Sequence, residues 1–206
     1  ELASERVWQE LAKGLLEAHP AQMLSVLRDC GALAQVMPEV DVLYATGSRA
    51  RRSQANPGAR LSLALEYAAK RAFTLPVRYA VLAHDFNDSA VLARSAAPRA
   101  RAMRELRRAE AMSARLKVPL ECRDAARLAA RWHGIVARAP SLQPAVLLGV
   151  INAADALRRP TRLDCFGLDE ESNRLRLMAF SGRMPKVTVL SRLCSRSIAA
   201  SQVFDA

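Results

Sequence analysis

Hydrophobic residues recur at spacings of three and four along most of the chain, a pattern that predicts α-helices. In the segment 4–16, Val7, Trp8, Leu11 and Leu15 follow this spacing, so the first helix is predicted there. A second helix is predicted from Pro20, a residue suited to a first helical turn, to Gly31, a typical helix stop. A short third segment, 32–37, is predicted to end before Pro38.

The remaining periodic segments predict more helices. They are 59–72, 76–84, 98–116, 119–132 and 144–157. Strand-like alternation competes only at 186–190, and the residues after it favour a terminal helix, whereas 167–185 is the least regular stretch. The sequence therefore predicts an all-α fold, a compact bundle of about eight helices.

One segment without periodicity divides the chain. Residues 46–58 contain Gly, Ser, Asn and Pro together with Arg49, Arg51 and Arg52, which predicts a basic loop. We expect a helical segment over 1–45, this loop, a second helical domain over 59–166 and a C-terminal extension over 167–206.

The composition is that of a globular domain. The 206 residues are 51% hydrophobic and 25% charged, and no apolar run reaches the length of roughly 18 residues that a membrane span needs. Four widely spaced cysteines, with no CxxC pair, predict buried free thiols in a reducing cytoplasm. Because the chain begins at Glu1 without an initiator Met, we expect it to be a piece of a longer protein.

The net charge of +11 comes from 27 Arg and four Lys against 20 acidic residues, and it favours polyanions as partners. In the predicted helix 98–116, Arg101, Arg104, Arg107 and Arg108 lie close in helical angle and form a positive ridge. With the loop arginines they predict a contact to the RNA backbone, although a solvated helix face remains the alternative. Aromatic residues are only 5% of the chain and are not interleaved with these clusters, so base stacking is not predicted.

Several short motifs, in a fixed order, carry a resemblance. They are SERVWQEL at 4–11, LRDCGAL at 27–33, LAHD at 82–85, RLKVP at 115–119 and DALRRP at 155–160. Over roughly 4–166 the chain resembles the bacterial CCA-adding tRNA nucleotidyltransferases. In the multifunctional version of these enzymes such segments follow a catalytic head and neck, and the HD domain comes after them.

The resemblance implies tRNA as a partner and, in the complete enzyme, addition of cytidine and adenosine from CTP and ATP with Mg²⁺. That chemistry needs a Gly-Ser loop followed by a pair of Asp residues. The dipeptide Gly47-Ser48 is followed next by the carboxylate of Glu66, so it reads as a turn. We expect the transfer site to lie in an N-terminal head outside this chain, and this segment to act as scaffold and basic tRNA-binding surface.

The resemblance also implies an HD phosphohydrolase site, in which His and Asp side chains hold a divalent metal such as Ni²⁺, Mn²⁺ or Mg²⁺. His84-Asp85 matches the doublet and Asp155 the last Asp, with His133 as a peripheral candidate. Arg60 stands at the first His and has no lone pair for a metal. One hypothesis is therefore a metal-dependent phosphohydrolase. The other is an ion pair of Arg60 with Asp85 and Asp155 that replaces the metal. Homodimerisation through apolar helices is a third hypothesis.

Overall fold

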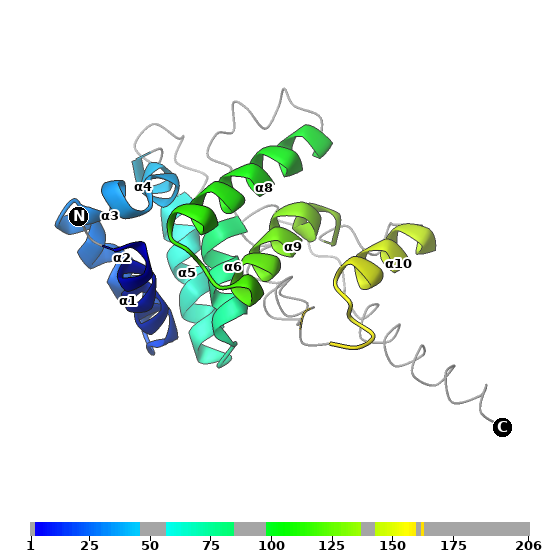
Figure 1. Cartoon of the computed structure of the whole chain (residues 1–206), viewed down its shortest axis with the longest axis horizontal. Helices are drawn as coiled ribbons and strands as arrows, with labels where there is room; N and C mark the ends of the chain where they lie inside the picture. Colours follow the sequence, from blue (N-terminus) through cyan, green and yellow to red (C-terminus); the bar gives the residue numbers. More distant parts are fainter. Residues whose placement is uncertain (1–2, 46–56, 85–97, 137–142, 160–161, 163–206) are drawn as a thin grey trace.

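The computed structural model describes residues 3–45, 57–84, 98–136, 143–159 and 162. Within these ranges every regular element is helical, which confirms the predicted all-α class. Figure 1 shows the helices arranged from α1 at one end of the molecule to α10 at the other. The predicted loop arginines, the stretch 167–185 and the segment 186–190 lie outside the described residues.

The first four helices form one end of the molecule. They are α1 (Ser4–Leu16), α2 (Pro20–Asp29), α3 (Ala32–Val36) and α4 (Pro38–Ala45). Gly31 adopts a left-handed φ of 73°, which lets the chain turn between α2 and α3 without a Cβ clash. Helix α4 was not predicted, because six of its eight residues are apolar or small and the helical period is hidden.

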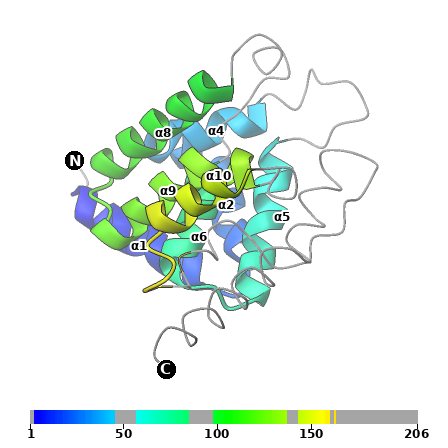
Figure 2. The ribbon, with the colours of Figure 1, turned by 90° about the vertical axis from the view of Figure 1, so that its right-hand side faces the viewer.

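The other described helices are α5 (Pro57–Lys70), α6 (Leu75–His84), α8 (Pro98–Arg115), α9 (Leu120–Val136) and α10 (Pro144–Ala153). The central helix α6 packs against α9, α5, α1 and α8, and α9 also packs against α8. In Figure 2, α10 lies in front of α9, on the end of the molecule opposite α1. Two predicted helix ends were wrong. Helix α9 was expected to end at 132 but continues through Gly134 to Val136, and α10 was expected to end at 157 but stops at Ala153.

Buried side chains from both halves of the chain meet in one core. Trp8, Leu24 and Met37 from the first helices pack with Leu65, Tyr79 and other residues of α5–α9. A second, smaller cluster joins α6, α9 and α10. The core thus contains residues from both sides of the predicted loop 46–58. The predicted division of the chain into domains stays a prediction.

Two residues expected in the core are exposed. Cys30 lies at the end of α2 with its Sγ donating to the Leu27 carbonyl oxygen at 3.4 Å, whereas Cys122 is buried as predicted. Met103, whose spacing in the predicted helix 98–116 is that of a core position, is 45% exposed near the start of α8.

Candidate nucleic-acid interface

Helix α8 is the most basic element of the described chain and contains six Arg against two Glu. Arg104, Arg107 and Arg108 are exposed on it. Arg101 belongs to the same helix, but its side chain is outside the described residues, as are Arg49, Arg51 and Arg52. The predicted RNA contacts of all seven residues remain predictions.

Acidic residues neutralise the basic groups around the C-terminal end of α8. Arg115 donates two hydrogen bonds to Glu39 of α4, at 2.9 and 2.7 Å, and these bonds raise the pKa of the Arg115 guanidinium. Arg127 of α9 pairs with Glu110 of α8 at 2.8 Å. Lys117 pairs with Glu5 of α1. These pairs leave little net charge for a ligand at this end of α8.

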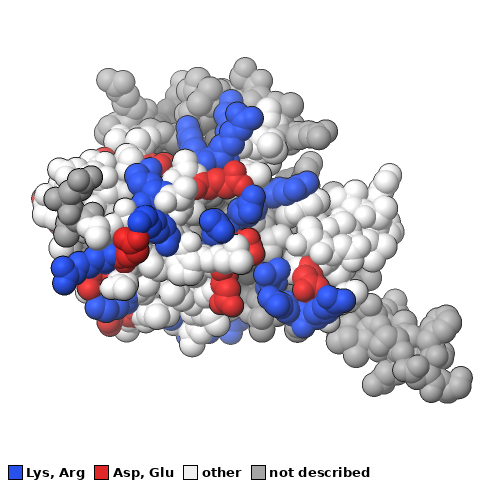
Figure 3. All heavy atoms as spheres, viewed as in Figure 1, with Lys and Arg blue, Asp and Glu red and all other residues white. Residues whose placement is uncertain are grey.

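Toward the N-terminal half of α8, Arg104 and Arg107 differ from these paired groups. Within the described ranges no acidic group forms an ion pair with Arg104 or Arg107. Figure 3 shows basic and acidic side chains interspersed over the visible face, with basic groups at the outer edge formed by α8. The positive potential available to a polyanion is therefore expected to be highest at this half of α8.

The pairs between α8 and α9 establish how the two helices run. Glu110 lies beside Arg127, and Glu105 lies beside His133 with 3.8 Å between Oε2 and Nδ1. As the residue number falls along α8 it rises along α9, so the helices are antiparallel, as Figure 1 also shows. The N-terminal half of α8 is thus next to the C-terminal half of α9.

Three arginines lie over aromatic rings, an arrangement that the sequence analysis did not anticipate. The Cζ atom lies 5.2 Å from the ring centroid for Arg28 over Tyr44, 5.8 Å for Arg71 over Tyr67 and 5.2 Å for Arg131 over Trp132. None of these three arginines belongs to the clusters at 49–52 and 101–115, so the expectation that aromatic residues are not interleaved with those clusters stays a prediction. In the sequence, the adjacent pair Arg131-Trp132 is the signal of one of these contacts.

The positions of the predicted HD site are spread over four helices that pack in sequence: α5 on α6, α6 on α9 and α9 on α10. Arg60 is half-buried in α5. His84 ends α6 with a side chain outside the described residues, and Asp85 lies outside them entirely. The doublet is the centre of the predicted site, so neither its metal ligation nor its pairing with Arg60 is tested.

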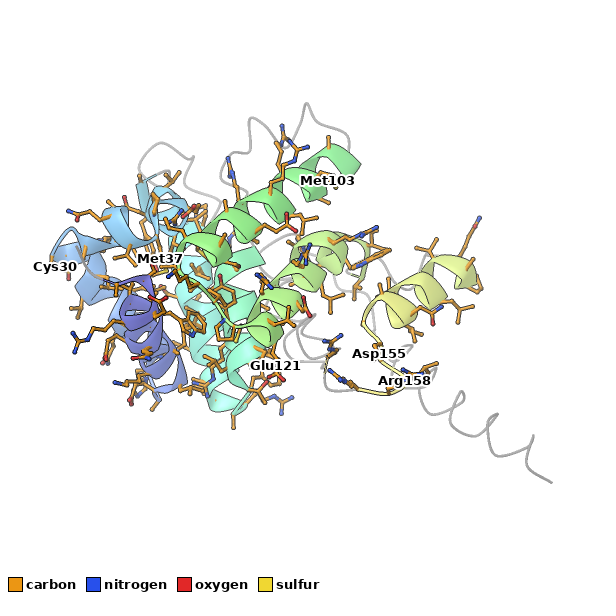
Figure 4. All side chains as sticks on the ribbon, in the orientation of Figure 1. Cys30, Met37, Met103, Glu121, Asp155 and Arg158 are labelled. Carbon is orange, nitrogen blue, oxygen red and sulfur yellow. The ribbon has the colours of Figure 1, made fainter. Side chains whose placement is uncertain are left out.

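The two remaining positions have defined surroundings. His133 donates its Nδ1 proton to the Ala129 carbonyl oxygen at 2.9 Å. Asp155 follows α10 at a left-handed φ of 51°, and its carbonyl oxygen accepts hydrogen bonds from the amides of Arg158 and Arg159. Figure 4 shows Asp155 and Arg158 close together beyond α10. Within the described ranges, His, Cys, Asp and Glu form no group of three that is able to hold a metal ion.

Helix α8 also buries a carboxylate that the sequence analysis missed. Glu105 is only 4% exposed and faces His133. A charged residue between arginines on a basic helix gives no sequence signal of burial, and only the packing of α8 on α9 reveals it. Among the described helices, none is long and apolar enough to span a membrane.

Comparison with known proteins gives two kinds of similarity. Residues 1–43 match the family model described as "Probable RNA and SrmB- binding site of polymerase A". Over 164 residues, or 78% of the chain, the sequence is 45% identical to the Multifunctional CCA protein of Dechloromonas aromatica. The proteins of the same name from Azoarcus sp. and Burkholderia mallei are 45% and 42% identical over 166 residues. The chain covers 40% of the length of each of these curated relatives, and no solved structure matches it.

Proposed function

We propose, from the homology of this chain to part of the multifunctional CCA proteins, that it is the C-terminal helical portion of a CCA-adding tRNA nucleotidyltransferase. In this role it supplies a scaffold and a basic surface for the tRNA backbone, and the nucleotidyl-transfer site lies in a head outside the chain. Its partners are then tRNA and that N-terminal head, and its compartment is the cytoplasm.

One observation carries the RNA-binding part of this proposal. Arg104 and Arg107 project from an exposed helix without acidic partners in the described structure, whereas the neighbouring Arg115 and Arg127 are paired. Exposed, unneutralised arginines release counterions when they contact phosphates, and this release favours binding. The family match over 1–43 supports the same conclusion. It covers Glu39, which pairs with Arg115 at the end of α8, and Glu5, which pairs with Lys117 two residues later.

The experiment measures tRNA binding by the 206-residue chain as a function of salt. Replacing Arg104, Arg107 and Arg108 by Gln is expected to weaken binding at least tenfold at low salt. The triple substitution should also make the plot of the logarithm of the binding constant against the logarithm of the salt concentration less steep, by roughly 0.7–0.9 for each lost phosphate contact.

The matched control is the double variant Arg127→Gln, Glu110→Gln, which removes one paired charge of each sign and leaves the net charge unchanged. This variant should bind tRNA like the wild type. Equal affinity and equal slope for the triple variant and the wild type would contradict the proposed surface.

A second candidate function is a metal-dependent HD phosphohydrolase. The consecutive packing of α5, α6, α9 and α10 favours it, because Arg60, His84 and His133 lie on the first three of these helices and Asp155 follows the fourth by two residues. The donor set fits a metal incompletely, since a guanidinium stands where the pattern has a His. We therefore rank the Arg60 ion pair ahead of the metal. Homodimerisation is the third hypothesis, and the exposed Val146, Leu148 and Leu157 around α10 support it.

A further inference from the structure

The chain makes a sharp turn of defined geometry where α10 ends. The Ala156 amide donates to the Ile151 carbonyl oxygen at 3.0 Å. The Asp155 amide donates to the Asn152 carbonyl oxygen, also at 3.0 Å, and together these are the two bonds of a Schellman motif. The motif needs one residue in the left-handed conformation, and Asp155 supplies it with a φ of 51°. Asp adopts this conformation more readily than most residues other than Gly, so the sequence favours a turn here.

Packing and hydrogen bonds then fix the backbone of the next residues. Ala154 and Ala156 are buried in the smaller apolar cluster of α6, α9 and α10. The amides of Arg158 and Arg159 both donate to the Asp155 carbonyl oxygen, at 3.2 and 2.9 Å. The backbone of these two arginines is therefore held at a defined place, while both side chains are exposed.

A third arginine connects this turn to α9. The Arg162 amide donates to the Arg159 carbonyl oxygen at 3.0 Å, and its guanidinium lies 3.9 Å from the Asp124 carboxylate. Within the part of the chain that the structure describes, no acidic group forms an ion pair with Arg158 or Arg159. Asp155 is the one acidic residue of the segment 154–159, so the segment keeps a positive charge.

Two groups of basic side chains are thus available on different parts of the molecule. Figure 3 shows basic side chains gathered around an acidic one in the region where Figure 4 places Asp155 and Arg158. The other group is on the N-terminal half of α8, and both are visible on the same face. Helix α9 packs against α8 and α10 and lies between the two groups (Figures 1 and 2).

Exposed arginines without acidic partners suit a phosphate backbone, because they lose no ion pair when they bind it and they release counterions from the nucleic acid. We propose that Arg158 and Arg159 form a second phosphate-binding surface, which contacts the backbone of the same RNA molecule that α8 binds. An RNA as long as tRNA is expected to contact both surfaces across α9. This surface rests on the proposed function, because it adds a contact for the same RNA.

The test measures tRNA binding by the 206-residue chain at several salt concentrations. The double variant Arg158→Gln, Arg159→Gln is expected to weaken tRNA binding about fivefold to tenfold at low salt. It should also make the plot of the logarithm of the binding constant against the logarithm of the salt concentration less steep by roughly 1.4–1.8, or 0.7–0.9 for each of two phosphate contacts. The variant Arg158→Lys, Arg159→Lys keeps both charges and should retain most of the affinity and of the steepness.

The matched control is Lys70→Gln, Arg71→Gln at the end of α5, which also removes two adjacent, exposed positive charges. Because the net charge changes equally in both double variants, the control isolates the effect of position. The control should bind tRNA with nearly the affinity and steepness of the wild type. When the Arg158→Gln, Arg159→Gln changes are combined with the triple variant of α8, the two losses in the logarithm of the binding constant should add, because the surfaces are separate.

Wild-type affinity and steepness in the Arg158→Gln, Arg159→Gln variant would overturn the second surface. A loss no larger than that of the control would overturn it as well. In either case, a loss of affinity in the triple variant of α8 would leave the proposed function intact. A wild-type chain that does not bind tRNA would instead contradict the proposed function, and the second surface with it.

Discussion

At the scale of single residues, Tyr79 shows how a polar atom is accommodated in the core. It is the largest fully buried side chain of the described structure, and its ring meets Trp8 edge to face at 5.3 Å. Its hydroxyl donates to Ser113 Oγ at 2.9 Å, because the Ser113 proton is used in the bond to the Ala109 carbonyl oxygen at 2.6 Å. Burial raises the pKa of the Tyr79 hydroxyl to about 12. Burial likewise raises the pKa of the Cys122 thiol to about 11.

These two pKa shifts predict a loss of stability at alkaline pH. The unfolded chain releases the protons first, at its ordinary values of 9.0 and 10.0, while the folded chain retains them. The stabilisation is therefore complete below about pH 9 and falls as the pH rises toward 12. For Tyr79 the full shift corresponds to about 2–3 kcal/mol.

Urea unfolding from pH 6 to 11.5 measures this effect. Tyr79→Phe and Cys122→Ala should each make the alkaline decline of the free energy of unfolding less steep than in the wild type. Between pH 6 and 8 neither group titrates. The difference in the free energy of unfolding between each variant and the wild type in this range therefore gives the pH-independent effect of the substitution. A decline equally steep in wild type and variants would rule out these groups as its source.

Arg60 permits a test of the HD hypotheses at one residue. If Arg60 replaces the metal, the wild-type chain should bind no Ni²⁺ or Mn²⁺ after chelation and dialysis. The substitution Arg60→His should then restore near-stoichiometric binding, because it completes the donor pattern of the HD site. Asp85→Ala in the Arg60→His background should abolish that binding. Stoichiometric metal in the wild type, with phosphodiester hydrolysis lost in Asp85→Ala, would instead establish the phosphohydrolase.

At the scale of elements, Arg78 joins α6 to α1. Its side chain is only 6% exposed and donates to the carbonyl oxygens of Leu15, Glu17 and Phe73 at 2.8, 3.0 and 2.9 Å. The last carbonyls of α1, which have no partner within the helix, are thereby satisfied by a charged donor. Two of the three acceptors lie at the C-terminal end of α1, so the buried guanidinium connects α6 to this end of α1.

We expect Arg78→Met, which keeps much of the volume but removes the donors, to lower the free energy of unfolding by about 2–4 kcal/mol. Urea denaturation measures the change. Arg71→Met is the control on a nearby exposed position, and it should cost well under 1 kcal/mol. A loss for Arg78→Met no larger than for the control would show that the three bonds contribute little net stability.

Element prediction from sequence succeeded where the period was long and the ends were marked. Ser4–Leu16, Pro98–Arg115 and the start of α10 at Pro144 follow from apolar spacing and proline at the first turn. Helix α4 was missed because its apolar residues surround the helix. The end of α9 was placed too early, because packing of Val136 in the second cluster outweighs the cost of Gly134 within the helix.

The candidate site was predictable only in part, for a related reason. Arginines on one helix face are visible in the sequence, because helical angle follows from spacing. Their neutralisation is not visible, since Arg115 pairs with Glu39 across 76 residues and Arg127 with Glu110 across 17. Which arginines remain available to RNA depends on these long-range pairs.

At the scale of the whole molecule, connections between distant parts of the sequence hold the matched segment 1–43 in place. Lys117 pairs with Glu5, Arg115 with Glu39, and Glu66 of α5 accepts hydrogen bonds from the His19 ring and the Ala21 amide. The RNA-binding segment suggested by the family model and the basic helix α8 therefore form one continuous packed body (Figure 1). A tRNA bound at α8 is expected to meet a surface whose parts keep fixed distances.

The buried bond from Arg78 to α1 has a consequence for protein synthesis. Arg78 follows Leu15 by 63 residues, so at roughly 5–20 residues per second α1 is made several seconds before its C-terminal carbonyls find their donor. During this interval the apolar face of α1, with Trp8, Leu11 and Leu15, has no α6 to cover it. Helix α1 thus receives its last hydrogen-bond donors only after α6 has been translated, and its apolar face is accessible to a chaperone during this interval.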